Sequence, residues 1–341
     1  MRAARRFPLW SLLGVAAAMA LLAFWVEQEA RGPGPLSEEQ IFVVTAGESA
    51  RTVLNRLEAE GALPSAVRAE WWWRIRQGGL QVRAGRYLLA ERTSPQALLE
   101  QLSQGRVLLE SLTIIEGSTF ADFRRALAKH PEVTQTLSEL SDLEVMDELG
   151  LAGHPEGRFF PDTYRFAAGT RDRDILLLGY TKMARELAAV WASRQENLPL
   201  KSAEEALILA SIVEKETGLA SERPQVAGVF ISRLRRGMRL QSDPTIIYGL
   251  GDAYDGDIRT RDLRTDTPYN TYTRAGLTPT PISLPGAESL RAVVQPLETG
   301  DLFFVATGKG DGSHQFSRTY AEHREAVQSM LARQRAGRDR P

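Results

Sequence analysis

The chain has 341 residues, a formal net charge of −1 at pH 7 and a pI of about 6.5, so no global basic field favours a nucleic-acid partner. It contains no cysteine, which excludes disulfides, thiol catalysis and cysteine-ligated metals, and its four histidines show no HxxxH or HExxH spacing for zinc. We therefore expect no metal and no other cofactor, and the length favours two domains.

An uncharged apolar run at residues 7–26 comes near the start of the chain. As a helix, at about 1.5 Å per residue, it just spans a hydrocarbon core of about 30 Å. Three arginines precede it and two glutamates follow closely, so the positive-inside rule leaves residues 1–6 in the cytoplasm. The alternative, a cleaved signal peptide, has a shorter apolar core and a small-residue cleavage site, whereas this run ends in FWVEQEARG. We expect a single-pass anchor in the cytoplasmic (inner) membrane, with the bulk of the chain extracytoplasmic, in the periplasm.

A small α+β unit is predicted at residues 40–107, after a polar linker at 27–39. Serines there are placed as helix N-caps and glycines as helix stops. The expected order is strand, helix, helix, strand and helix, at residues 40–44, 49–61, 66–77, 80–90 and 95–103. The segment resembles a LysM-like domain, especially in TAGESARTVLNRLEAEGAL and AGRYLLAERTSPQALLEQLSQGR. Such domains typically bind the glycan of cell walls.

Three consecutive tryptophans, Trp71, Trp72 and Trp73, lie in the predicted helix 66–77. Tryptophan rings can form a stacking platform for sugars. Three adjacent residues cannot share one face of a helix, however, so we expect two of the three to pack in the core.

A larger α+β domain is predicted at residues 108–335, followed by a charged tail at 336–341. Strand-like runs enclose a series of helical patterns, among them a long amphipathic one at 170–192. The stretch from 265 to 286 holds four prolines and little apolar periodicity. Long irregular loops inside compact domains are often functional, so this loop is a candidate part of a site.

The main catalytic candidate lies in the helical stretch AEEALILASIVEKET, residues 203–217. At about 100° per residue, Glu216 continues an apolar stripe, whereas Glu214 points about 160° away from it. A carboxylate on an apolar face must be paired or hydrogen-bonded, or its pKa rises. A raised pKa suits a general acid near neutral pH. The alternative is that both glutamates belong to a solvated last turn.

Four blocks in order carry a more specific signal than any one of them: ASIVEKET, ERPQVAGVFISRLRRGMRLQSDPTIIYG, TPYNTYTRAGL and GDGSHQFS. Together they resemble the YceG-like endolytic murein transglycosylase family (MltG), over roughly residues 40 to 330. The resemblance implies a lyase that cuts the β-1,4 bond between N-acetylmuramic acid (MurNAc) and N-acetylglucosamine (GlcNAc) inside nascent peptidoglycan strands. Cutting leaves 1,6-anhydro-MurNAc ends and helps to terminate glycan elongation. Glycan polymerases are therefore implied as partners, besides the glycan itself.

The resemblance also implies which residues form the site. The family's catalytic glutamate is the second Glu of an E-K-E motif and maps onto Glu216. Tyr248, Tyr269, Asn270 and Thr271 lie in the matching blocks and are expected to line the sugar groove. Tyrosine rings suit sugar faces, and asparagine suits acetamido and hydroxyl groups.

Asp243 and His314 complete the list of substrate-binding candidates. Asp243 and Glu214 are the available second carboxylates, and we expect a structural role for each, because Asp243 precedes Pro244 in a turn and Glu214 points off the Glu216 face. His314 either contacts substrate or completes a hairpin. Two other functions stay open: a muramidase-type hydrolase, which usually pairs two carboxylates, and an inactive membrane-tethered glycan-binding scaffold.

Overall fold

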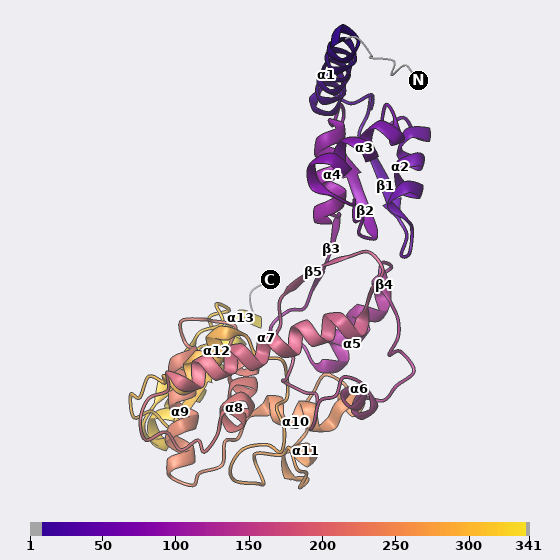
Figure 1. The fold of residues 1–341 in the computed structure, drawn as a ribbon. Coiled ribbons are helices and arrows are strands. Elements are labelled where there is room, and N and C mark those ends of the chain that lie inside the picture. The colour runs from indigo at the N-terminus through magenta and orange to yellow at the C-terminus, as the bar shows by residue number, and fades with distance from the viewer. Residues whose placement is uncertain (1–8, 339–341) are drawn as a thin grey trace, which may run out of the picture. The chain divides into compact units, whose positions relative to one another are not determined.

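The computed structural model describes residues 9–338, which divide into two compact units (Figure 1). The first unit comprises the chain up to Glu110 together with Arg165–Gly169, and the second comprises Ser111–Tyr164 and everything from Thr170. The predicted cytoplasmic stub, residues 1–6, lies outside the described residues. The mixed α+β class is confirmed, and every sheet in the described chain has two strands.

The first unit contains the apolar helix and the predicted small α+β unit. Its elements follow the expected order of strands and helices: α1 (Leu9–Arg31), β1 (Gln40–Val44), α2 (Ala50–Ala59), α3 (Ala66–Gln77), β2 (Gly85–Leu89) and α4 (Pro95–Gln104). Strands β1 and β2 pair antiparallel, with Phe42 opposite Tyr87, and both rings are buried. Ser49, Ser65 and Ser94 cap α2, α3 and α4, as their positions predict.

Helix α1 is, among the described residues, the one helix long and apolar enough to cross a membrane, by length and composition. Its described side chains are exposed as far as Trp25, whereas Ala30 is buried against the first unit. The helix therefore runs five residues past the predicted anchor, into the stretch expected to be a linker, because its last turn packs on α3 and α4.

The prediction for the tryptophan triplet is confirmed. Trp72 and Trp73 are 8% and 7% exposed and belong to the core of the first unit, whereas Trp71 is 61% exposed.

The remaining elements run from β3 to α13. They are β3 (Leu109–Thr113), α5 (Phe120–Lys129), β4 (Val133–Thr134), α6 (Asp142–Glu148), β5 (Thr163–Ala167), β6 (Thr170–Arg171), α7 (Asp172–Ala192), α8 (Ala203–Glu216), α9 (Arg223–Arg235), α10 (Asp243–Leu250), a 3₁₀ turn η1 (Gly251–Ala253), α11 (Thr260–Arg264), α12 (Ala287–Val294), β7 (Phe303–Ala306), β8 (His314–Ser317) and α13 (Tyr320–Arg338). Strands β3 and β5 pair, β4 and β6 pair in parallel, and β7 and β8 form an antiparallel hairpin. Residues 265–286 contain no helix or strand, as predicted.

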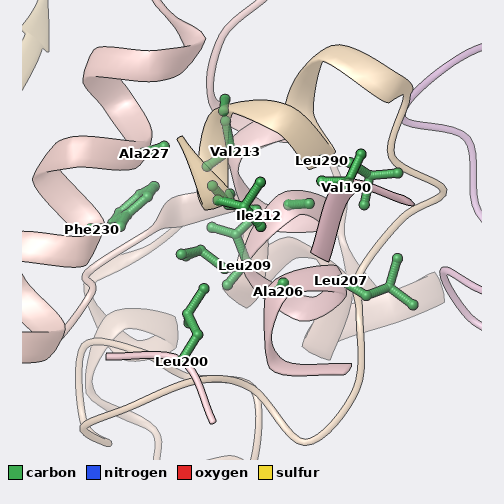
Figure 2. Packing of buried hydrophobic residues seen from close by; sticks show 14 of the residues in the cluster. Val190, Leu200, Ala206, Leu207, Leu209, Ile212, Val213, Ala227, Phe230 and Leu290 are labelled. Carbon is green, nitrogen blue, oxygen red and sulfur yellow. The ribbon is translucent and has the colours of Figure 1, made fainter. Parts of the chain in front are cut away.

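Helix α8 is the centre of the second unit. Ser202 caps its start by accepting the Glu205 N–H at 3.2 Å. All eight residues from Ala206 to Val213 are buried, because α7, α9, α10 and α12 pack around the helix. Figure 2 shows these side chains meeting those of the neighbouring helices, including Phe230 of α9 and Leu290 of α12. A helical segment that is buried on all sides belongs to the core. This segment of α8 therefore fixes the position of Glu216, the last residue of the helix.

Candidate active site

Glu216 is the last residue of α8, where the buried helix reaches the surface of the core. The Ser242 hydroxyl donates a hydrogen bond to Oε1 of Glu216. Burial raises the pKa of Glu216 to about 7, and the negative charge of Asp243 also raises it. The Ser242 hydrogen bond and the positive charge of Arg233 act in the opposite direction. Glu216 can therefore hold a proton near neutral pH and also release it.

Ser242 is itself held rigidly. Its N–H donates to Oγ1 of Thr271 at 2.9 Å, and its carbonyl accepts from Oγ1 of Thr245 at 2.7 Å. The two threonine hydroxyls are 2.9 Å apart. Gln241, just before Ser242, has a φ of 52°, a left-handed conformation that non-glycine residues rarely adopt. This unusual conformation of Gln241 occurs where the chain turns and directs the Ser242 side chain towards Glu216.

Asp243 is exposed and is the first residue of α10. Its Oδ1 accepts a hydrogen bond from the Tyr272 hydroxyl at 2.6 Å. Asp243 acts on Glu216 through its charge, and Pro244 after it favours the start of the helix.

Glu214 has both carboxylate oxygens occupied by structural contacts. Its Oε1 accepts from Arg223 of α9 at 3.0 Å, and its Oε2 accepts the Gly286 N–H at 2.9 Å. The side chain is 4% exposed. Glu214 therefore joins α8 to α9 and to the start of α12, in agreement with the structural role expected for it.

A second group of polar side chains surrounds Tyr248 of α10. The Tyr248 hydroxyl donates to Oε2 of Glu156 at 3.2 Å, and its ring meets the Tyr269 ring edge-on at 5.0 Å. The other oxygen of Glu156 accepts the Phe120 N–H at 3.0 Å. Burial raises the pKa of Glu156 to about 7.

A cavity of about 610 Å³ opens beside these residues. Its lining includes Glu156, Tyr248, Lys215 and Pro244. Glu216 is not among the lining residues, but Lys215 and Pro244 adjoin Glu216 and Asp243 along the chain. The cavity therefore reaches the chain segments that carry Glu216 and Ser242, and it is large enough for part of a sugar chain.

The remaining predicted residues are distributed differently. The Asn270 side chain is buried. Its amide donates to the carbonyls of Asp262 and Leu263 in α11 and of Thr265 just after it, while its oxygen accepts the Tyr272 N–H. Asn270 and Thr271 thus shape the loop and place Ser242, and both are buried. Nδ1 of His314 lies 2.7 Å from Oε2 of Glu222, so His314 joins β8 to the start of α9.

Sequence reasoning missed Ser242 and Glu156. Ser242 is separated from Glu216 by 26 positions, and Glu156 from Tyr248 by 92. The positions beside them carried a signal, since Ser242 precedes the Asp243–Pro244 helix start and Glu156 precedes an aromatic block at 159–166. Within residues 9–338, no group of three or more histidines and carboxylates is arranged to hold a metal ion.

Comparison of the sequence and of the fold finds similar proteins in several bacteria. An endolytic murein transglycosylase of Bacillus subtilis (strain 168) is 27% identical over 307 residues, covering 85% of this chain and 84% of that protein. One of Streptococcus pneumoniae (strain D39) is 29% identical over 283 residues, and the match spans 71% of this chain but only about half, 51%, of that protein.

Comparison with solved structures gives the same family. A crystal structure of a yceG-like protein of Listeria monocytogenes matches with a TM-score of 0.54 and 26% identity, covering 85% of this chain and 99% of that one. The model of the YceG-like family matches residues 42–329, which include both groups of polar side chains described above. The chain is therefore a member of the YceG-like family.

Proposed function

We propose that this protein is an endolytic murein transglycosylase, with Glu216 as its acid and base. The observation that carries the proposal is a partly buried glutamate with a pKa of about 7, held by a serine at the end of a buried core helix. The relatives named above carry the same activity in their names, so the hydrolase and the inactive scaffold are not favoured.

The reaction needs one carboxyl group. Neutral Glu216 donates its proton to the glycosidic oxygen as the bond from C1 of MurNAc to that oxygen breaks, and the GlcNAc leaves with a free hydroxyl group. Positive charge develops at C1 and the ring oxygen. The Glu216 carboxylate then takes the proton of the C6 hydroxyl of the same MurNAc, and O6 bonds to C1. The product is a 1,6-anhydro ring, no water is consumed, and Glu216 is protonated again.

The surrounding residues support these two proton transfers. A pKa of about 7 lets Glu216 act as acid and then as base at the same pH. The Ser242 hydroxyl fixes the carboxyl orientation and stabilises its charged form after the first transfer. Asp243 keeps the pKa from falling and, with its partner Tyr272, offers polar groups at the start of α10.

The sugar groove in this proposal runs along the cavity beside α10. Tyr248 lines the cavity and Tyr269 packs edge-on against its ring, so the two tyrosines would supply aromatic surface for the sugar rings. Asn270 and Thr271 act beneath the groove, by shaping the loop and placing Ser242. In this proposal His314 has the structural role that the sequence left open, because Glu222 holds its Nδ1 and His314 does not line the cavity.

We also propose the place of the protein in the cell. Helix α1 would anchor it in the cytoplasmic membrane with the stub inside and the two units outside, where nascent glycan and its polymerases are found. Residues 40–107 would be a LysM-like glycan-binding domain and 108–335 the catalytic domain. The helix is apolar and unburied up to Trp25, as a membrane segment would be.

The proposal is tested by comparing wild type with Glu216→Gln on uncrosslinked glycan strands. We expect the variant to lose at least about a thousand-fold in rate, because an amide can neither donate nor accept the transferred proton. Glu288→Gln is the matched control, since Glu288 is an exposed glutamate of α12 that pairs with Arg291. Activity of Glu216→Gln close to that of the control would refute Glu216 as the acid.

A further inference from the structure

One exposed apolar surface in the first unit has no role in the proposed reaction. It consists of Val67, Trp71 and Ile75, spaced four residues apart on α3, and they are 55%, 61% and 78% exposed. Side chains with this spacing share one face of a helix. We call these three residues the α3 stripe. A row of large apolar side chains in water is unfavourable and marks a surface that something covers.

The α3 stripe lies beside the end of the apolar helix α1. Arg68 of α3 pairs with Glu29 of α1 at 2.7 Å and lies over the Trp25 ring, 5.3 Å from its centroid. Trp72 donates its indole N–H to Glu27 at 2.8 Å, and Arg76 pairs with the same carboxylate. Two turns of α3 therefore contact the end of α1, from Trp25 to Glu29. Figure 1 shows α3 next to this end of α1.

These contacts fix the side of α3 on which the stripe lies. At about 100° per residue, Ile75 projects about 20° from Arg68, and Trp71 about 60° from it. Measured from Trp72, the middle of the three residues that contact α1, Ile75 projects about 60° away and Trp71 about 100°, so Ile75 adjoins the surface that holds α1 and Trp71 lies farther round the helix. The exposed apolar surface of α1 ends at Trp25, at the level where Arg68 contacts that ring.

We propose that the α3 stripe lies on the outer surface of the bilayer that α1 crosses, with Trp71 and Ile75 in the zone between headgroups and acyl chains. The inference rests on the proposal that α1 spans the membrane. If it does, its hydrocarbon segment ends close to Trp25, and the side chains that α3 holds at Glu27 and Glu29 are in the interfacial zone, which adds several ångströms on each side of the hydrocarbon core. Tryptophan is enriched at this depth because its ring is apolar and its N–H is polar.

A sugar platform is the competing interpretation of Trp71, and the neighbours of Trp71 disfavour it. A glycan-binding aromatic needs hydrogen-bonding groups beside the ring to hold the hydroxyls. The flanking members of the stripe, Val67 and Ile75, have none. Arg74, on the same exposed side, already pairs with Glu70 at 2.9 Å. Apolar neighbours suit lipid better than sugar.

The surface would restrain the first unit rather than anchor the chain. If α1 were the one membrane contact, the first unit could change its tilt relative to the bilayer. A second contact through α3 would hold it against the membrane and fix the height at which the following chain starts.

The absence of cysteine makes a direct test possible, because any introduced cysteine is the only labelling site. The full chain, carrying a spin label at Trp71→Cys or Ile75→Cys, is placed in lipid nanodiscs, and the label's collision rates with oxygen and with a water-soluble nickel complex are compared. Leu143→Cys in α6 is the matched control, since Leu143 is also 61% exposed. Leu21→Cys, in the middle of α1 and 70% exposed, reports whether α1 itself is in lipid.

We expect the ratio of oxygen to nickel collisions at positions 71 and 75 to exceed that at 143 several-fold and to lie below that at 21. A lipid-like ratio at 21 with water-like ratios at 71 and 75 would overturn the α3 contact and leave the anchor standing. A water-like ratio at 21 would overturn both. Immobilisation of the label at 71 by added glycan strands, with a water-like ratio before the addition, would assign the stripe to sugar instead.

Discussion

Replacement of Ser242 by alanine tests how Glu216 is tuned. The substitution removes the hydroxyl that donates to Glu216 and keeps the Ser242 N–H bond to Thr271, because that bond uses the backbone. A hydrogen bond to a charged group contributes about 1.5–3 kcal/mol, and one pKa unit corresponds to about 1.4 kcal/mol. Because the residue Glu216 is only partly buried, we take the lower end, about one unit.

The direction of the shift follows from which form the bond stabilises. Ser242 stabilises the charged carboxylate, so its loss raises the pKa of Glu216 above about 7. The first step needs protonated Glu216, so activity is lost as the pH rises through this pKa. We therefore expect the alkaline limb of kcat/KM to move up by about one pH unit in Ser242→Ala.

The assay is the pH dependence of kcat/KM on uncrosslinked glycan strands, since this parameter reports pKa values of the free enzyme. Ser289→Ala is the control, because Ser289 is also buried and its hydroxyl has no hydrogen-bond partner in the described chain. An alkaline limb that stays in place in Ser242→Ala, or moves to lower pH, would show that Ser242 does not tune the catalytic group.

Three other substitutions test separate parts of the structure. Asp243→Asn removes a charge that raises the pKa of Glu216, so the alkaline limb should move down by a fraction of a unit while activity persists; complete loss, on measuring rates across pH, would make Asp243 a catalytic carboxylate. Glu156 has a pKa of about 7 against 4.5 when unfolded, so it binds more protons in the folded state, and stability should fall by up to about 3 kcal/mol as pH rises from 4.5 to 7. Glu156→Gln should make that fall smaller in urea unfolding, with the part due to Glu216 remaining, and an unchanged slope would exclude Glu156 as a source. Ile212→Ala should cost about 2–5 kcal/mol of unfolding free energy, because Ile212 is fully buried in α8; a loss below about 1 kcal/mol in the same unfolding assay would contradict the tight packing.

Local chemistry explains what could be predicted from the sequence. Helix 66–77 begins after a serine N-cap and ends before a glycine with φ of 86°, so its bounds follow from neighbouring residues. The burial of two tryptophans of the triplet follows from helical geometry alone. Glu216 stood out because it continues an apolar pattern within its own helix.

Contacts between distant segments explain what could not be predicted. Asn270 looked like a sugar ligand by residue type, but its amide donates to backbone carbonyls at the end of α11 and the start of the loop. Nothing near Glu156 in the sequence indicates Tyr248 as its partner, because the bond forms only when α10 folds back to the loop that carries Glu156. The continuation of α1 past residue 26 depends on packing against α3 and α4, which hydropathy does not report.

The oxygen atom at the newly formed end of the glycan distinguishes the possible reactions. Wild-type protein would be incubated with uncrosslinked strands in water enriched in ¹⁸O, and the products analysed by mass spectrometry. If Glu216 transfers a proton from the C6 hydroxyl, every new MurNAc end is a 1,6-anhydro ring and carries no ¹⁸O. Reducing ends that contain ¹⁸O would mean that water attacks C1, and Glu216 would then belong to a hydrolase that needs a second carboxylate.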